Sequence, residues 1–290
     1  MFLQRKACRS SRQGEEMIKK LNVLSLGVIL LMLAYFANAF ATPSTHIWAP
    51  STDIQPYKKI HSTADFYFPT TGKGPNDQHN YVLQVYGLTF SVFSDKPEEN
   101  LLGKIWKPLG KVMAETGFDY KKGLGSFLDS NPWYFHFKFG IPEGYSKFTC
   151  PLGNIDTPAF VVGAYDMGTR SHRTNYNVWY FKIAKTIDIA KFNLGKFSAG
   201  YFNGNGRLLR DKDGLRDNAG PMLAWERTMC EISPKLWLSV DYQGTQSGYG
   251  AMNYGFAWSF TPDISAILGY DIYNNRNLTD TITLQLDVNF

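Results

Sequence analysis

The strongest constraint on the fold comes from the last ten residues, 281–290. Polar and apolar side chains alternate there without a break, and the segment ends on Phe290. A repeat of two residues is that of a β-strand with one polar and one apolar face. Such a strand suits the closing position of a barrel in lipid, because closure leaves no unpaired edge and lipid covers the apolar face. The apolar face carries Ile282, Leu284, Leu286, Val288 and Phe290.

The front of the chain has the pattern of a secretory signal peptide. Two lysines follow Met17, residues 21–36 are almost wholly apolar, and Ala39 and Ala41 are small residues spaced for cleavage. This pattern predicts a signal peptide over residues 1–41, cut after Ala41 or alternatively after Ala39, with Met17 as an alternative start. A single transmembrane anchor of similar length is the competing interpretation. The small residues at the end of the apolar run, in place of a basic flank, disfavour it.

Composition after cleavage favours a membrane barrel. Cleavage would leave 24 of the 30 Lys and Arg residues and 23 of the 25 Asp and Glu residues, so most of the net positive charge lies in the leader. The charge is therefore no evidence for nucleic-acid binding. Aromatic residues make up 16% of the chain, yet the mean hydropathy is −0.26. A membrane barrel combines these properties because only alternate residues face lipid. A secreted soluble β-sandwich or barrel is the competing interpretation.

Alternation and strand-forming composition predict about twelve strands. Their connections differ in length: residues 231–235 and 261–263 form tight turns, whereas 203–218 is long and rich in Gly, Asp and Asn. Counted back from the last strand, the two tight turns fall at the same end as both termini. The connections 94–108 and 142–156 fall at that end too and are long. The expected strands span residues 60–68, 81–93, 112–120, 133–141, 158–168, 176–185, 192–202, 221–230, 236–243, 252–260, 264–273 and 281–290.

The signal peptide and the amphipathic last strand ending in Phe290 resemble those of bacterial outer-membrane β-barrels. The resemblance covers the whole chain after the leader and identifies a class of protein. It implies an all-β fold, a transmembrane antiparallel up-and-down β-barrel of about twelve strands over residues 58–290. It also implies location in the outer membrane of a Gram-negative bacterium, with both termini periplasmic and with the terminal strand, at Phe290, read by the barrel-insertion machinery.

Residues 42–57 are not expected to form a strand. They contain three prolines, Pro43, Pro50 and Pro56, and proline cannot donate to a β-ladder. We expect an N-terminal segment that either stays in the periplasm or enters the lumen.

The polar faces of the expected strands supply candidates for the barrel lumen. One interpretation is structural, because small barrels fill their interior with paired polar side chains. The other is a solute pathway. A pathway selective for one charge would need a ring of one sign, and the set is mixed, so no selectivity follows. The candidates are Asp65, Gln84, Glu115, Asp119, His136, Lys138, Asp241, Gln243, Asp271, Gln285 and Asp287.

Catalysis is disfavoured by residue spacing. One family of twelve-stranded outer-membrane phospholipases uses a His and a Ser two positions apart on one strand face. The neighbours here are the adjacent pairs His61-Ser62 and Ser171-His172, and adjacent residues point to opposite faces of a strand. The second pair falls in a loop but has no evident carboxylate to orient the histidine.

We therefore expect a channel or porin-like protein that passes small solutes. The alternative is a plugged barrel with a structural or surface-binding role, and an outer-membrane hydrolase is the least favoured function. No metal or cofactor is expected, because residues 211–214 lack the order of a calcium loop. Cys150 and Cys230 are expected as unpaired thiols rather than as the disulfide that a periplasm would permit. Arg227 is expected on the outer face near a strand end, where it can reach an interface.

Overall fold

The structure, a computed structural model, describes residues 44–70, 82–94, 96–123, 129–150, 153–189 and 192–290. The expected signal peptide lies outside the described residues. None of the helices in the described part is long and apolar enough to cross a membrane.

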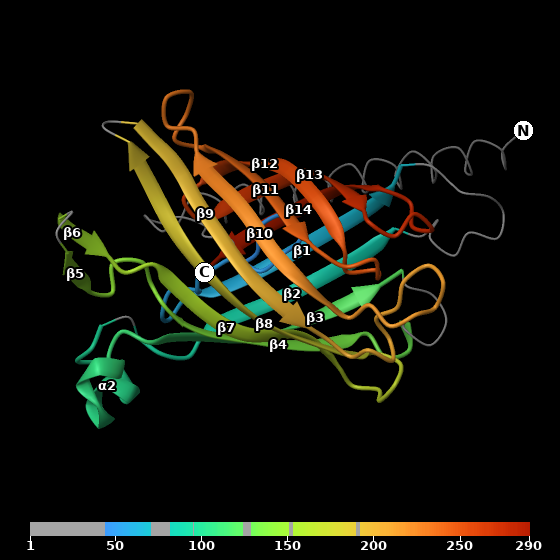
Figure 1. Cartoon of the computed structure of the whole chain (residues 1–290), viewed down its shortest axis with the longest axis horizontal. Coiled ribbons are helices and arrows are strands. Elements are labelled where there is room, and N and C mark those ends of the chain that lie inside the picture. The colour runs from blue at the N-terminus through green and yellow to red at the C-terminus, as the bar shows by residue number, and fades with distance from the viewer. Residues whose placement is uncertain (1–43, 71–81, 95, 124–128, 151–152, 190–191) are drawn as a thin grey trace, which may run out of the picture. The chain divides into compact units, whose positions relative to one another are not determined.

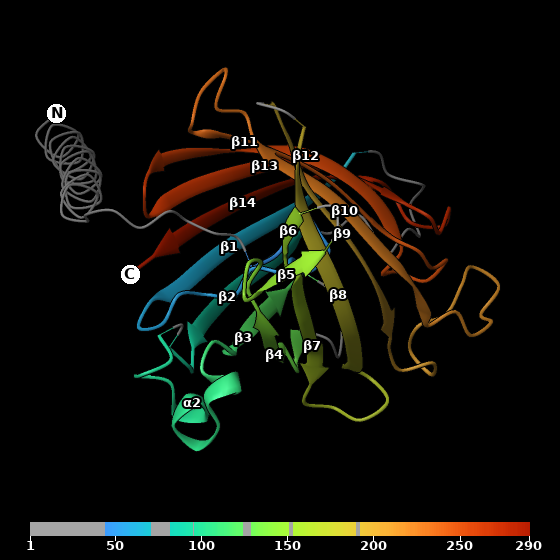
Figure 2. The same cartoon turned by 60° about the vertical axis from the view of Figure 1, so that its left-hand side comes forward.

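Twelve of the described strands form one closed barrel, and each is antiparallel to its neighbours (Figures 1 and 2). Strands adjacent along the barrel are also successive along the chain, apart from a small hairpin between β4 and β7. The predicted up-and-down β-barrel of about twelve strands is confirmed. Its strands are β1 (Ile60–Pro69), β2 (Leu83–Ser91), β3 (Met113–Lys122), β4 (Trp133–Ile141), β7 (Ala159–Gly168), β8 (Asn175–Ile189), β9 (Phe192–Asn203), β10 (Ala219–Thr228), β11 (Leu236–Gln243), β12 (Ala251–Thr261), β13 (Ile264–Tyr273) and β14 (Thr281–Asn289).

The last strand closes the barrel against the first. β14 pairs with β1 from His61 opposite Asn289 to Pro69 opposite Thr281. Beyond that ladder, the backbone N–H of Phe290 donates to the carbonyl of Ile60 at 2.8 Å, and the reverse bond is 3.2 Å. The barrel therefore has no free edge, as a closed sheet requires.

The alternation in β14 separates the two faces of the wall. Leu284 is 41% exposed on the outside, whereas its neighbour Thr283 is fully buried on the inside. Other strands repeat the pattern, with Phe256, Tyr254 and Trp258 exposed on β12. The outer surface is thus rich in aliphatic and aromatic side chains, as a surface in contact with lipid would be.

The end of the barrel at which β1 begins and β14 ends has two elements that the sequence did not predict. The β2–β3 connection holds a short helix α2 (Leu101–Ile105) and a 3-10 turn η1 (Lys107–Leu109). The β4–β7 connection holds a two-stranded hairpin of β5 (Lys147–Cys150) and β6 (Gly153–Asp156). Figure 1 shows both additions at the same end of the molecule. They account for the length of the connections 94–108 and 142–156.

Residues 44–57 lie inside the barrel, and we call this segment the plug. Ile47, Ala49, Ser51 and Gln55 are all at most 1% exposed. The wall side chains that bind them come from strands on several sides of the barrel. The described part of the N-terminal segment therefore occupies the lumen.

Candidate functional site: the barrel lumen and its plug

The plug begins with a tight turn. The N–H of His46 donates to the carbonyl of Ala49 at 2.8 Å, and the N–H of Ser51 donates to the carbonyl of Ser44 at 3.0 Å. Pro50 lies in this turn, where its missing N–H costs no ladder bond. The chain then leaves towards β1 through Lys58, whose φ of 65° lies in the left-handed region.

Asp241 of β11 holds the tip of this turn. Its carboxylate accepts the backbone N–H groups of Ile47 at 2.8 Å, Trp48 at 3.2 Å and Ala49 at 3.1 Å. The side-chain amide of Asn253 on β12 donates to the same carboxylate at 2.8 Å. Hydrogen bonds to an ionised acceptor are stronger than neutral ones. Asp241 is thus both buried and fully engaged by the plug and its neighbouring strand.

Two wall lysines hold carbonyl groups of the plug. Lys138 of β4 donates to the carbonyls of Ser44 at 2.9 Å and Asp53 at 2.6 Å, and it pairs with Glu115 of β3 at 3.0 Å. Lys182 of β8 donates to the carbonyl of Pro50 at 2.9 Å. Both ammonium groups are buried, so the carbonyls replace part of their lost hydration.

Further wall groups hold the plug from other sides. Glu115 accepts the backbone N–H of Gln55 at 2.6 Å, and Gln285 of β14 donates to the carbonyl of Ile47 at 2.6 Å. Lys196 of β9 pairs with the Asp53 carboxylate at 2.7 Å. The plug is thus bound by β3, β4, β8, β9, β11 and β14.

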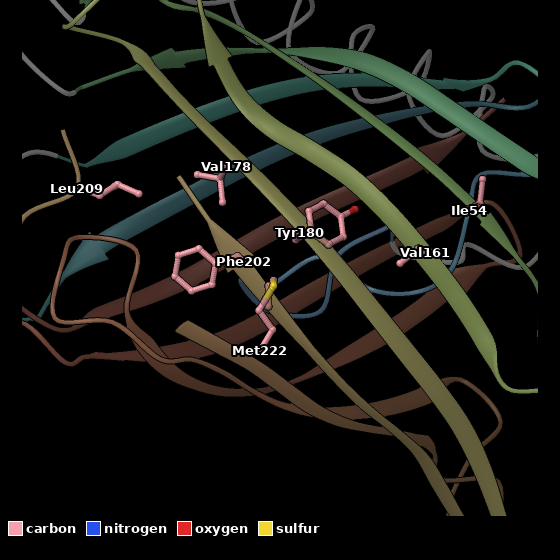
Figure 3. Close-up of a cluster of buried hydrophobic side chains, with 8 residues drawn as sticks. Ile54, Val161, Val178, Tyr180, Phe202, Leu209 and Met222 are labelled. Atoms are coloured by element: carbon pink, nitrogen blue, oxygen red, sulfur yellow. The ribbon is translucent and has the colours of Figure 1, made fainter. Parts of the chain in front are cut away.

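Apolar contacts fix the plug at two further places. Ala49 and Ile54 belong to a buried cluster with side chains of β7 to β10, which Figure 3 shows around Tyr180, Phe202 and Met222. Ile47 packs in a second cluster with Ala257 and Ile267. Gly269 makes room for Ile47, because a Cβ built there would lie 2.7 Å from its Cγ2 atom.

His46 is the buried titratable side chain of the plug. Its Nδ1 atom lies 4.0 Å from Glu226, and neither ring nitrogen has a hydrogen-bond partner among the described residues. Burial, reinforced by the charges of Lys182, Lys196 and Lys138, holds the pKa of His46 well below its usual 6.5. The imidazole is therefore neutral while the plug is in place.

A cavity of about 540 Å³ lies between the plug and the long loops. Ser44, Ile47 and Trp48 of the plug form part of its lining, as do Leu208 and Tyr249 of loops at the other end. The cavity is a vestibule that reaches the plug from the end opposite the termini, and its volume is typical of small-molecule pockets.

The wall of the vestibule carries ion pairs. Lys121 pairs with Asp166 at 2.5 Å and His61 with Asp287 at 3.2 Å. Another pair joins His136 to Asp119 at 3.6 Å. Tyr249 donates to Asp166. Most of the charged side chains that line the vestibule are therefore paired with other side chains of the barrel wall.

Ten of the eleven candidate lumen residues lie on the inner face. Glu115, Lys138, Asp241 and Gln285 bind the plug. Asp65, Asp119, His136 and Asp287 line the vestibule. The remaining two bond within the wall, Gln243 to the Tyr165 hydroxyl at 2.8 Å and Asp271 to Thr281 at 2.7 Å.

Gln84 corrects the sequence prediction, because it lies on the outer face of β2. The exposed hydroxyl of Tyr86 donates to its side chain at 3.1 Å, and Tyr86 is 41% exposed. Val85, with the opposite orientation, lines the vestibule. Strand alternation places residues 84 and 86 on one face and residue 85 on the other.

Sequence reasoning missed Lys182 and Lys196 as lumen residues. Both lie in strands whose alternation is less regular. Tyr180 and Ala184, two residues before and two residues after Lys182, nevertheless point inward. This pattern of neighbours indicates that Lys182 shares the inner face with them.

The other singled-out residues lie at the barrel ends. Arg227, near the end of β10, contacts the Phe192 ring at 4.5 Å and pairs with Glu231 at 2.8 Å. His172 is in the exposed β7–β8 loop, where Arg207 contacts its ring at 2.9 Å. Cys230 carries a free, exposed thiol, and the side chain of Cys150 lies outside what the structure describes.

Comparisons with known proteins give distant likenesses. No protein-family model and no curated protein matches the chain. The fold is similar to the outer membrane protein Omp33 of Acinetobacter baumannii, with 12% identity over 80% of this chain and 97% of that chain and a TM-score of 0.38. It is similar to an outer membrane channel of Pseudomonas putida F1, with 9% identity, 83% and 98% of the two chains covered and a TM-score of 0.41.

A further likeness is to Salmonella typhi OmpF in complex with daunomycin, with 7% identity, 80% and 96% of the two chains covered and a TM-score of 0.36. At these identities and TM-scores the likenesses carry no argument about function. The assignment as a β-barrel rests on the closed strand topology of this chain.

Proposed function

We propose that the protein is an outer-membrane channel for small solutes in which the plug limits flow. The observation that carries the proposal is that the plug precedes β1 and takes no part in the barrel sheet. Its displacement would open the lumen and leave every strand pair in place. The vestibule already extends from the loop end to the plug, so the plug obstructs the lumen at the inner end of the vestibule.

The location in a membrane is supported by the outer face of the barrel. Its exposed side chains on β12 and β14 are aliphatic and aromatic, and their inward neighbours are polar or small. A soluble barrel would not expose such a band to water. The outer membrane is inferred from the secretory pattern at the front of the chain together with the amphipathic last strand.

Planar bilayer recordings test the channel. Folded wild-type protein should give discrete conductance steps, and a variant with a weakened plug, Asp241→Asn, should give larger or more frequent ones. Folding of both proteins is verified by a heat-dependent shift in gel mobility. Absence of steps from both folded proteins, over several preparations, would remove the channel proposal.

A plugged barrel with a structural or surface-binding role is the second candidate. It is favoured by the number of wall groups that bind the plug, from Lys138 and Lys182 to Asp241. The same recordings separate the two, because a permanently plugged barrel stays silent when the Asp241 contact is weakened.

We propose no catalytic role. Among the described residues, the His172 ring contacts Arg207 and its backbone N–H donates to Asn175, so neither contact supplies a carboxylate that would orient the ring as a general base. Any lipase activity found in a preparation should survive His172→Ala. Loss of that activity in a folded variant would support the hydrolase.

We propose that the barrel-insertion machinery recognises the last strand. Phe290 is 52% exposed beside the β1–β14 seam, where an insertion factor could contact it before closure. Phe290→Ser should lower the amount of heat-modifiable barrel in outer-membrane fractions, while Phe260→Ser, an exposed aromatic at the end of β12, should not. Equal yields from both variants would remove this role.

A further inference from the structure

The vestibule has one acidic side chain that forms no ion pair with the described residues. Four of its five acidic residues form ion pairs within the wall. Asp65 forms none among the described residues, and its hydrogen-bond donor is the neighbouring Thr63 hydroxyl. The acidic lining residues are Asp65, Glu115, Asp119, Asp166 and Asp287.

A second carboxylate lies close to this one. Gly87 of β2 is opposite Thr63 in the β1–β2 ladder and opposite Asp119 in the β2–β3 ladder. A Cβ at Gly87 would lie 2.7 Å from Asp119 Oδ1 and 2.7 Å from Thr63 Cγ2. The missing side chain therefore lets Asp119 and the Thr63–Asp65 pair converge over one strand. Asp119 itself contacts His136 at 3.6 Å, so two carboxyl groups and one imidazole meet at this corner of the vestibule.

Aromatic rings stand beside that corner. Trp48 of the plug is half-buried and lines the vestibule. It makes edge-to-face contacts with Tyr67 at 5.4 Å and with Tyr273 at 5.8 Å. Tyr67 is two positions from Asp65 on the same face of β1, so the rings and the carboxylate line one wall. Aromatic faces attract cations and also cover apolar surface.

A buried polar atom of the vestibule also has no partner. The hydroxyl of Tyr134 is enclosed and makes no hydrogen bond among the described residues, although Tyr134 lines the same cavity. Buried polar groups are normally satisfied by protein, water or ligand. A solute with a second polar group would provide such a partner.

We propose that the vestibule binds small organic cations, specifically an ammonium group attached to an apolar or aromatic body. The ammonium donates to the carboxylate of Asp65, and the body packs against Trp48 and Tyr67. The inference rests on the proposed channel function and names the class of solute that the channel would admit. Anionic solutes are disfavoured, because their own carboxylate would lie against the carboxyl groups of Asp65 and Asp119.

Calorimetric titration of the folded protein in detergent tests the site. The probes are benzylammonium, neutral benzyl alcohol and anionic benzoate, which share one ring. We expect benzylammonium to bind at least about tenfold more tightly than benzyl alcohol, the factor that one charge-assisted hydrogen bond supplies, and benzoate not to bind. Similar affinities for all three would overturn the proposal.

Variants locate the binding. Asp65→Asn should lose about tenfold in benzylammonium affinity, and Asp65→Glu, which retains the charge, should keep most of it. Asp271→Asn is the matched control, because Asp271 is a buried inward carboxylate that bonds to Thr281. Unchanged affinity in Asp65→Asn would overturn the assignment, as would an equal loss in Asp271→Asn. The heat-dependent mobility shift verifies that each variant is folded.

Failure of this inference is distinguishable from failure of the channel. Binding in detergent without conductance in bilayers would support the cation site and contradict the proposed channel function. Conductance without selective binding of benzylammonium would support the channel function and contradict the cation site.

Discussion

The carboxylate of Asp241 accepts the backbone N–H of Ile47 at 2.8 Å, across 194 positions of the sequence. The neighbouring contacts have the same character, because Lys138, Lys182 and Gln285 also bond to main-chain atoms of the plug. The wall thus binds the course of the plug backbone, and most of these contacts do not depend on which side chains the plug carries.

Weakening the Asp241 contact should release the plug. Asp241→Asn removes the charge that strengthens three hydrogen bonds, and each bond to a charged group contributes about 1.5–3 kcal/mol. We expect single-channel recordings to show a higher open fraction than wild type. Asp271→Asn, which lies in the same wall without touching the plug backbone, should leave the open fraction unchanged. An equal response from both variants would mean that general loosening of the barrel is responsible.

A steric change should release the plug without altering charge. Gly269→Ala places a Cβ 2.7 Å from Ile47 Cγ2 and 2.9 Å from Thr283 Cγ2, and overpacking of this kind costs about 1–3 kcal/mol. We expect increased conductance. Gly248→Ala is the matched control, since a Cβ there has Leu278 Cδ1 as its nearest neighbour at 3.8 Å.

The Ile47→Ala background shows whether the clash is with the plug. There the same glycine substitution should have a smaller effect, because Ile47 Cγ2 is absent and only the contact with Thr283 remains. If the two substitutions had additive effects on conductance, the clash caused by Gly269→Ala would not be with Ile47.

Acidification should favour release of the plug through His46. When the plug is docked, burial and the nearby lysines hold the His46 pKa well below 6.5, whereas a hydrated imidazole titrates near its ordinary value. Above that value both states are neutral and pH has no effect through this group. Below it the released plug binds a proton that the docked plug does not, so release gains up to about tenfold per pH unit.

Conductance between about pH 7 and about pH 5 measures this effect. Wild type should open progressively, and His46→Phe should respond less. Besides the three lysines, Glu226 at 4.0 Å faces the ring, and this carboxylate already pairs with Lys196 and accepts a bond from Trp237. Identical pH profiles for wild type and variant would exclude His46 as the responsible group.

A charge on the outer face should impair insertion into lipid. Leu284→Arg puts a guanidinium near the middle of β14, where an arginine in the bilayer core costs about 2–4 kcal/mol. The refolded fraction in lipid vesicles, measured by the mobility shift, should fall. Leu215→Arg, in a loop and 66% exposed in the native protein, should refold as wild type does. Equal refolding of the two variants would argue against lipid at the outer face.

The barrel was predictable because its signal is local. Residues 252–260 and 281–290 alternate cleanly, and their inward and outward assignments agree with the structure. The prediction for Gln84 is wrong, because a polar side chain by itself indicates the inner face whereas the pattern of its neighbours indicates the outer face. Tyr86, Leu88 and Phe90 form the more apolar face of β2, and Gln84 shares that face near the strand end.

The contacts of the plug could not be predicted in the same way. Gln55 meets Glu115 across 60 positions and Ile47 meets Gln285 across 238. Both contacts use main-chain atoms of the plug, so no side chain in the plug marks its partner. The three prolines excluded a strand but left the periplasm and the lumen equally open.

The short connection from the plug to β1 also determines how the lumen would reclose. Lys58 and Lys59 alone separate the plug from Ile60, so a released plug remains tethered at the mouth of the barrel. A tether this short gives an effective concentration in the millimolar range. Opening and reclosing are then unimolecular steps, with rates that do not change when the protein in the membrane is diluted.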